Sequence, residues 1–387
     1  MTDHYSIYYV IFFSNKWYHK GEKKISMSEK LKKLKIMLET DISKASKVFI
    51  VGHNEPDFDS IGSAIGLQVL CKHFNKEAYI VINDADIDLE PGVKHIIDNN
   101  KSNYNIITMQ EYQKLKDDNA TLIMTDVNKD YLVCVNNNLS DFKNIIIIDH
   151  HDEDSHTVKT DNKYIDMKVS SASEMVAQIL NSYRCRYSKD VATFLLSGIV
   201  LDTKRYIKNT SSKTHDVVEK LMNKGANVDY VNELFLVEFD EDRKINDLIF
   251  NGTIFQKYEY SVFQTHNISF TLNRKAPFTI YRRDEIAKAA DKMLKYRVDA
   301  AFVLGYTKDG AVTISARSKN NIDVGKIMSH MNGGGNPVNA GTKVISSNIL
   351  DTEKNLMQQV QWGFNIPEIQ GEEETIPAQK IKTNNKN

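Results

Sequence analysis

The stretch Asn144-Ile-Ile-Ile-Ile-Asp-His-His151 decides the fold of this chain, because it joins an apolar strand directly to a set of polar side chains. Four consecutive isoleucines predict a strand that is buried on both faces, as in a parallel sheet covered by helices. Asp149, His150 and His151 follow where this strand ends. Ligands of open α/β sheets bind beyond the carboxyl ends of the strands. The stretch therefore predicts an α/β fold with a site at this sheet edge.

Similar apolar runs precede this stretch and predict further strands of the same sheet. They are short and rich in β-branched residues, and they cover residues 47–53, 77–83 and 121–127. Helical patterns or loops separate them, which favours a mainly parallel sheet flanked by helices. We expect helices over residues 27–46, from near Asp59 and from near Asp190. Ser171 and Glu174 have the spacing of a capping box that starts another helix.

The second half of the chain has a different pattern and predicts a smaller α/β domain. Residues 211–255 are mostly helical in pattern. Strands are expected over residues 260–272, 300–307 and 311–318, and helices over residues 287–295 and 324–331. We place the domain division near residue 240. The expected parts are an N-terminal extension (1–26), a first domain with connecting helices (27–240), a second domain (241–366) and a disordered tail (367–387).

Composition excludes several classes of protein. Lys and Arg total 50 against 51 Asp and Glu, so the net charge of −1 offers no general attraction to duplex nucleic acid. The three cysteines are far apart and outside any CxxC pattern, which argues against disulfides and a zinc site and favours a cytoplasmic location. The apolar run at residues 5–13 is shorter than the roughly 20 residues that span a bilayer. A peripheral membrane contact through this run stays open. We also expect the chain to form a homodimer.

Polar residues at several segment ends predict a metal site. His53, Asp57 and Asp59 follow the first strand, Asp126 ends another, and Asp202 follows an apolar segment. Any one of these acids alone is typical of a helix cap or a loop. Together with His150 they would leave charge unpaired unless cations lay among them. Mixed carboxylate and imidazole ligands without thiolates favour manganese, iron or zinc over calcium, and the larger number of carboxylates favours the harder ions.

Six candidate ligands are enough for two ions that share one carboxylate. We assign His53 and Asp57 to one ion and Asp59, His150 and Asp202 to the other, with Asp126 as the bridge. Such a pair activates water for in-line displacement at phosphorus. His151 is the candidate catalytic donor to the phosphoryl group, and the alternative is that it only orients a ligand. Asp149 is expected to have a structural role.

A second cluster, in the substrate-binding half, could bind phosphate. Gly333, Gly334 and Gly335 precede Asn336, and glycines with positive φ let backbone amides approach an anion. Such a run alone is more typical of an ordinary loop. Arg317, near the end of an expected strand, could bind phosphate through two hydrogen bonds, with a surface ion pair as the alternative.

At these residues the sequence resembles the DHH/DHHA1 phosphoesterase superfamily. The stretches GHNEPDFDSIGSAIG (52–66), MTD (124–126), IDHH (148–151) and LDTKRY (201–206) are similar to its four motifs, in the same order. ISARS (314–318) and GGGN (333–336) are similar to its DHHA1 half. The resemblance implies a two-domain fold, a pair of manganese ions and an active site in the cleft between the domains.

Within the superfamily, the local sequence around these motifs is most similar to the catalytic core of GdpP-type cyclic-di-AMP phosphodiesterases. The stretch DTK (202–204) stands where oligoribonucleases commonly have DTG, and SSASEMV (170–176) also resembles the cyclic-dinucleotide enzymes. The implied reaction is hydrolysis of cyclic di-AMP to linear 5'-pApA. Asn336 departs from the histidine usual in that group. A nanoRNA or pApA oligoribonuclease is the enzyme alternative, and a cyclic-dinucleotide sensor that does not cut is the other.

Overall fold

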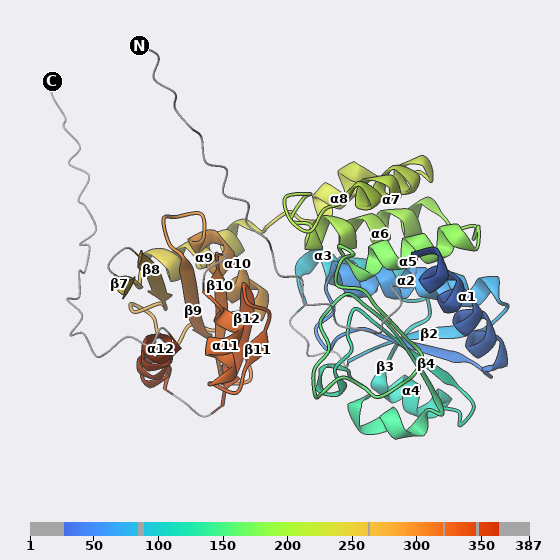
Figure 1. Ribbon diagram of the computed structural model, residues 1–387, viewed down its shortest axis with the longest axis horizontal. Helices are drawn as coiled ribbons and strands as arrows, with labels where there is room; N and C mark the ends of the chain where they lie inside the picture. The colour runs from blue at the N-terminus through green and yellow to red at the C-terminus, as the bar shows by residue number, and fades with distance from the viewer. Residues whose placement is uncertain (1–26, 84–88, 262–263, 320–321, 346–347, 364–387) are drawn as a thin grey trace, which may run out of the picture. The chain divides into compact units, whose positions relative to one another are not determined.

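The computed structural model describes residues 27–83, 89–261, 264–319, 322–345 and 348–363. Contacts divide the chain into two compact units, with the division between Val231 and Asn232. Each unit is built around its own six-stranded sheet (Figure 1). The expected extension (1–26) and tail (367–387) lie outside the described residues.

The sheet of the first unit is entirely parallel, as its uninterrupted apolar runs predicted. Its strands are β1 (Val48–Val51), β2 (Ala78–Ile82), β3 (Ile106–Thr108), β4 (Thr121–Thr125), β5 (Asn144–Asp149) and β6 (Lys163–Ile165). They lie in the order β3-β2-β1-β4-β5-β6. The order of successive strands therefore extends from β1 to one side as far as β3 and then from β4 to the other side as far as β6. Open α/β sheets bind their ligands at this switch point between β1 and β4.

Helices occupy the connections of the first unit. They are α1 (Met27–Lys44), α2 (Phe58–His73), α3 (Pro91–Asn100), α4 (Met109–Leu115), α5 (Ala172–Ser182), α6 (Lys189–Asp202) and α7 (Ser212–Asn223), with short 3-10 turns at Asp130–Leu132 and Asn136–Asp141. The division between the two units falls within α8 (Val228–Leu234). Helix α2 packs against the sheet and against α5 and α6, which lie above the sheet in Figure 1. Phe49 and Val51 point to the opposite face, where they pack with Tyr112 of α4.

The second unit has a mixed sheet. Its strands are β7 (Thr253–Ser261), β8 (Gln264–Thr271), β9 (Ala300–Tyr306), β10 (Val312–Ser318), β11 (Gly334–Gly335) and β12 (Asn339–Val344), in the order β11-β12-β10-β9-β8-β7. Only the β8–β9 pair is parallel among these ladders of the described residues. The helices are α9 (Phe239–Phe250), α10 (Arg283–Met293), α11 (Val324–Ser329) and α12 (Ile349–Gly363).

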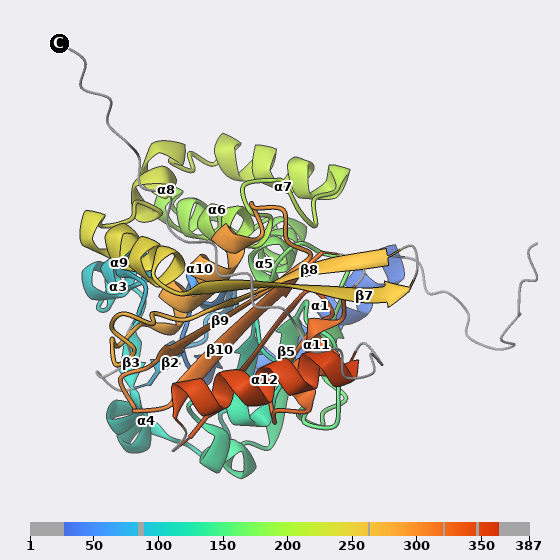
Figure 2. The ribbon, with the colours of Figure 1, turned by 90° about the vertical axis from the view of Figure 1, so that its left-hand side faces the viewer.

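Alternation along β9 gives this second sheet two apolar faces. Ala301 and Val303 pack with residues of α9 and α10, whereas Phe302 and Leu304 pack with residues of α11 and α12. Figure 2 shows α12 running across the sheet on its side facing the viewer. Because successive side chains of a strand point to opposite faces, one apolar run serves both layers.

The expected α/β class and parallel sheet are confirmed, and two local expectations were wrong. We expected helical pattern up to residue 255 and one strand over residues 260–272, but β7 already begins at Thr253 and pairs with β8. Ser171 caps α5 by accepting from the amide of Glu174, yet the Glu174 carboxylate accepts from the amide and hydroxyl of Ser170 instead of completing the capping box. Among the described residues, every helix is too short or too polar to cross a bilayer.

Candidate metal centre

The ends of three neighbouring strands bring candidate ligands to one edge of the first sheet. His53 follows β1, Asp126 follows β4, and His150 follows β5. Asp126 has a φ of 57°, a left-handed conformation that Asp tolerates better than most residues. Strained backbone of this kind clusters at functional sites. The parallel topology thus produces the convergence that the sequence predicted.

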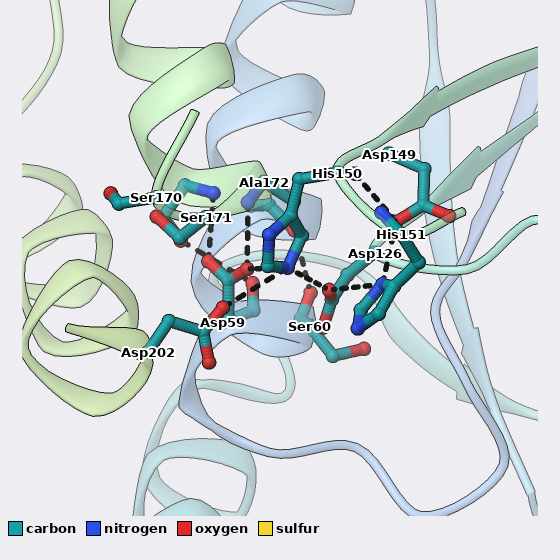
Figure 3. A network of polar contacts seen from close by, with 12 residues as sticks. Asp59, Ser60, Asp126, Asp149, His150, His151, Ser170, Ser171, Ala172 and Asp202 are labelled. Carbon is teal, nitrogen blue, oxygen red and sulfur yellow. Dashed lines mark hydrogen bonds and ion pairs between the residues drawn. The ribbon is translucent and has the colours of Figure 1, made fainter. Parts of the chain in front are cut away.

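The six candidate ligands form two overlapping groups that share Asp126. In one group, Nε2 of His53 lies 3.6 Å from Oδ2 of Asp57 and 3.5 Å from Oδ2 of Asp126. In the other, Nε2 of His150 lies 3.4 Å from Oδ1 of Asp126. The same nitrogen lies 3.8 Å from Oδ2 of Asp59 and 3.1 Å from Oδ2 of Asp202 (Figure 3). Each oxygen of Asp126 therefore faces a different group.

Four of these five separations are longer than an ordinary hydrogen bond and suit ligands around ions. Ligand atoms about 2.1 Å from one ion lie roughly 3.0 Å apart along an octahedral edge and roughly 3.4 Å apart along a tetrahedral edge. Oδ1 of Asp126 and Nε2 of His150 are buried without a hydrogen-bond partner. Buried polar atoms normally have partners, so the two orphaned atoms and the donor set suit divalent ions held between them.

The pKa values of the cluster also favour a site for cations. Burial opposes the charge of His53, but Asp57 and Asp126 outweigh burial and hold the pKa of His53 well above its ordinary value. Burial likewise opposes charging of His150, yet Asp126 and Asp202 raise its pKa. Burial raises the pKa of Asp59, and the charge of Asp126 raises it further. The metal-free cluster therefore holds protons that a bound ion would displace.

Asp57 has two roles, because its two oxygens face different partners. Oδ1 accepts from the amides of Asp59 and Ser60 at 2.9 and 3.0 Å and so caps α2. Oδ2 faces His53. The helix-cap interpretation and the ligand interpretation of this residue are compatible. Gly52 lets this loop approach α2, since a Cβ there would lie 1.8 Å from Oγ of Ser60.

His151 is held by Asp149, and Asp149 by a residue that sequence analysis missed. Oδ1 of Asp149 lies 2.9 Å from Nδ1 of His151 and accepts from the amide of His150. Asn128 donates from Nδ2 to Oδ2 of the same carboxylate at 2.6 Å. Burial lowers the pKa of His151, but Asp149 and Asp126 outweigh it and raise that pKa. The only sequence signal for Asn128 was its position two residues after Asp126.

The candidate phosphate residues belong to the second unit. Arg317 lies on β10, where its Nε donates to Oδ1 of Asp291 at 3.1 Å. Another guanidinium nitrogen donates to Oγ of Ser315 and to the carbonyl of Ala316. The guanidinium is thus fixed by three acceptors, in agreement with the ion-pair interpretation, and a role toward phosphate stays a prediction.

The glycine run differs from the backbone that we expected. Of its three glycines, only Gly335 has positive φ, 138°. Gly334 and Gly335 pair with β12, and a Cβ at Gly333 would lie 2.3 Å from the carbonyl of Gly341. Oδ1 of Asn336 accepts from the amides of Val338 and Asn339, which closes the following turn. Pairing with β12, which sequence analysis did not predict, sets this backbone.

Comparison with known protein families agrees with these two units. Residues 47–199 match the DHH family, N-terminal domain, and residues 275–361 match the DHHA1 domain. The chain is 18% identical in sequence to an exopolyphosphatase-related protein from Bacteroides fragilis of known crystal structure. The two structures have a TM-score of 0.65 over 89% of this chain and 98% of that one, so they share the fold.

Several curated relatives are longer than this chain. A membrane protein–large ribosomal subunit bL9 fusion protein of onion yellows phytoplasma is 29% identical over 328 residues, 82% of this chain and 37% of its own length. The cyclic-di-AMP phosphodiesterase GdpP of Bacillus subtilis is 29% identical over 331 residues, 84% of this chain and 49% of its own length. The chain thus spans half or less of these relatives. The two domain matches, in the order of the motifs, show that this chain contains a DHH family N-terminal domain followed by a DHHA1 domain.

Proposed function

We propose that this chain is a manganese-dependent phosphodiesterase that hydrolyses cyclic di-AMP to linear 5'-pApA. The observation that supports it most is the pair of ligand groups that share Asp126. His53 and Asp57 would hold one ion and Asp59, His150 and Asp202 the other. Bound ions there supply an activated water and offset negative charge at phosphorus.

Groups of the chain itself would assist the reaction. His151 is about half exposed, and Asp149 holds its Nδ1 side, so its other ring nitrogen can donate to the phosphoryl group or to the leaving oxygen. Asp126 presents one oxygen to each ligand group and fixes their separation. Arg317 and the backbone of Gly333, Gly334, Gly335 and Asn336 would bind the phosphate of the substrate.

The identity of the ions and of the substrate rests on separate arguments. Two imidazoles and four carboxylates without a thiolate suit manganese, and other divalent ions of similar hardness could replace it. Cyclic di-AMP is proposed because the cyclic-di-AMP phosphodiesterase GdpP of Bacillus subtilis is similar over most of this chain. A short oligonucleotide is the alternative substrate.

Product analysis by chromatography tests this proposal. The purified chain with Mn²⁺ is incubated with cyclic di-AMP, cyclic di-GMP and pApA as competing substrates, and with a short RNA in a parallel reaction. We expect cyclic di-AMP to disappear first, with pApA as the product. Rapid loss of the RNA or of pApA with cyclic di-AMP intact would favour the oligoribonuclease. Binding of cyclic di-AMP without any turnover in Mn²⁺ would favour the sensor.

Two further expectations accompany this function. The homodimer is tested by light scattering on the eluting protein, where a monomer mass would contradict it. The cytoplasmic location and the peripheral membrane contact are tested by fractionating cells that express the chain.

A further inference from the structure

Asp59, one of the candidate ligands, is held at both carboxylate oxygens by the start of a different helix. Oδ2 accepts from the amide of Ala172 and Oδ1 from the amide of Ser173, both at 2.7 Å. These are the first two residues of α5, where helix amides have no partner within the helix. The Asp59 side chain is fully buried. Its orientation is therefore set by α5 as well as by α2, on which it lies.

A glycine on a third helix leaves the space that this arrangement needs. A Cβ at Gly198 of α6 would lie 2.6 Å from Oδ1 of Asp59 and 2.3 Å from Oγ of Ser173. Real Cβ atoms do not approach so closely, so an alanine there must displace one of these groups. Gly198 lies four residues before Asp202, which ends α6 and faces the same imidazole of His150. Residues with this spacing share a helix face.

The two hydrogen bonds leave Asp59 able to bind an ion. A carboxylate has about four lone-pair sites, of which the two amides use two. Oδ2 also faces Nε2 of His150 at 3.8 Å. By contrast, the described hydrogen bonds and ion pairs of Asp57 and His53 of the other group are with each other, with the first turn of α2 and with Asp126. The helices α5 and α6 therefore position a ligand of only one group, the group of Asp59, His150 and Asp202.

We propose that the amides of Ala172 and Ser173, together with Gly198, are positioning elements that fix Asp59 for one ion of the pair. Loading of the ion at Asp59, His150 and Asp202 then depends on the junction of α2, α5 and α6. Loading of the ion at His53 and Asp57 does not. This inference rests on the proposed two-ion site. It adds the residues that control loading of the ion at Asp59, His150 and Asp202.

The Gly198→Ala variant tests the inference by Mn²⁺ binding, measured by titration calorimetry and by the electron paramagnetic resonance of coupled ions. Wild-type chain should bind two ions. In the variant we expect one ion with unchanged affinity, a second weakened by about tenfold or more, and loss of the coupled-pair signal. Gly66→Ala is the matched control, because its Cβ meets only side chains of Val176 and Leu195 at the same junction. The control should keep both ions.

A second variant keeps the inference testable if Gly198→Ala does not fold. Ala172→Pro removes one donating amide at the first helical position, where proline is compatible with a helix. The preceding Ser171 is extended, with φ −163° and ψ 159°, as a residue before proline should be. We expect the same selective loss of one ion. Lys189→Pro, at the equivalent position of α6, is the control and should bind both.

Three results would be decisive. Two ions bound at wild-type affinity in Ala172→Pro would overturn the positioning role, and so would an equal weakening of both ions, which indicates general disruption. If wild-type chain itself bound fewer than two ions, the proposed two-ion site would fail first. Circular dichroism of each variant establishes that it is folded before binding is compared.

Discussion

The side-chain amide of Asn128 donates to Oδ2 of Asp149 at 2.6 Å, and both residues are buried. Asp149 in turn holds Nδ1 of His151 at 2.9 Å. Asn128 thus acts on the His151 side chain through the carboxylate between them, and its Nδ2 also donates to the carbonyl of His151 at 3.3 Å. The proposed proton donor is therefore oriented by two buried groups that are outside the six ligands assigned to the two ions.

Removing the amide should therefore impair catalysis more than substrate binding. We expect Asn128→Ala to lower kcat by about tenfold or more with little change in KM, because His151 loses its fixed orientation. Oδ2 of Asp149, left buried without this donor, should also lower the free energy of unfolding by about 1–3 kcal/mol. Asn162→Ala, which removes a hydrogen bond to Asn144 at the start of β5, is the control. Wild-type kcat in Asn128→Ala would refute the orienting role.

Replacing the shared carboxylate should abolish turnover. We expect Asp126→Ala to lose at least about a thousandfold in kcat, since both ligand groups lose one member and the ions lose their bridge. Activity is measured with cyclic di-AMP at saturating Mn²⁺. Substantial residual activity, within about tenfold of wild type, would count against two ions acting together.

Stability of the metal-free chain should depend on pH through the two ligand histidines. The pKa values of His53 and His150 lie well above the unfolded value of 6.5. A raised folded pKa gives stability that is complete below pH 6.5 and is lost as pH rises through the folded pKa. Burial raises the pKa of Asp59 above its unfolded value of 3.8, so this residue also contributes stability that is lost as pH rises.

We therefore expect the Tm of the chain in EDTA to fall as pH rises from 6.5 to about 9. With saturating Mn²⁺ the fall should disappear, because the ions take the place of the protons. Scanning calorimetry at each pH measures both series. A Tm in EDTA that rises over this window would show that the imidazoles are not protonated in the folded state.

Arg317 provides a test of the substrate half of the proposal. Arg317→Ala should raise KM by about tenfold with kcat nearly unchanged, because a phosphate contact made equally in ground and transition states affects binding alone. Arg317→Lys keeps the charge without the paired geometry and should give an intermediate KM. A collapse of kcat at constant KM would instead place Arg317 in the transition-state machinery.

Arg184 offers a stability test that is independent of function. It has a φ of 52° just after α5, where the amide of Arg184 bonds the carbonyl of Asn181 and the amide of Cys185 bonds that of Leu180. This is the helix end at which glycine is favoured. Arg184→Gly should raise the free energy of unfolding by about 0.5–1 kcal/mol.

Arg186 is the matched control for that variant, because it is exposed nearby and does not have positive φ. Arg186→Gly should lower stability by a similar amount, since the unfolded chain gains freedom without relief of strain. Chemical denaturation measures both variants. Equal destabilisation by the two substitutions would contradict the account of this helix end.

The sequence was sufficient for the parallel sheet and for the convergence of its polar strand ends. Isoleucine-rich runs are buried on both faces, and parallel strands place their carboxyl ends at one edge, so His53, Asp126 and His150 had to meet there. The structure brings the other predicted residues beside Asp126 as well, and their assignment to two ions stays a prediction.

Features that depend on packing between distant segments could not be predicted from the sequence. The amides of Ala172 and Ser173 reach Asp59 across more than a hundred residues, and no local pattern predicts that contact. β12 (Asn339–Val344) contains Asn, Gly and Lys and lacks the alternation of a strand, so its pairing with the glycine run was missed. A sheet neighbour imposes that conformation, whereas local propensity does not.

Anomalous diffraction from crystals grown with Mn²⁺ tests the central claim most directly. The account predicts two peaks about 3.5–4 Å apart on either side of the Asp126 carboxylate, one beside His53 and Asp57 and the other beside Asp59, His150 and Asp202. A single peak, or ions bound elsewhere with this cluster empty at saturating manganese, would contradict it.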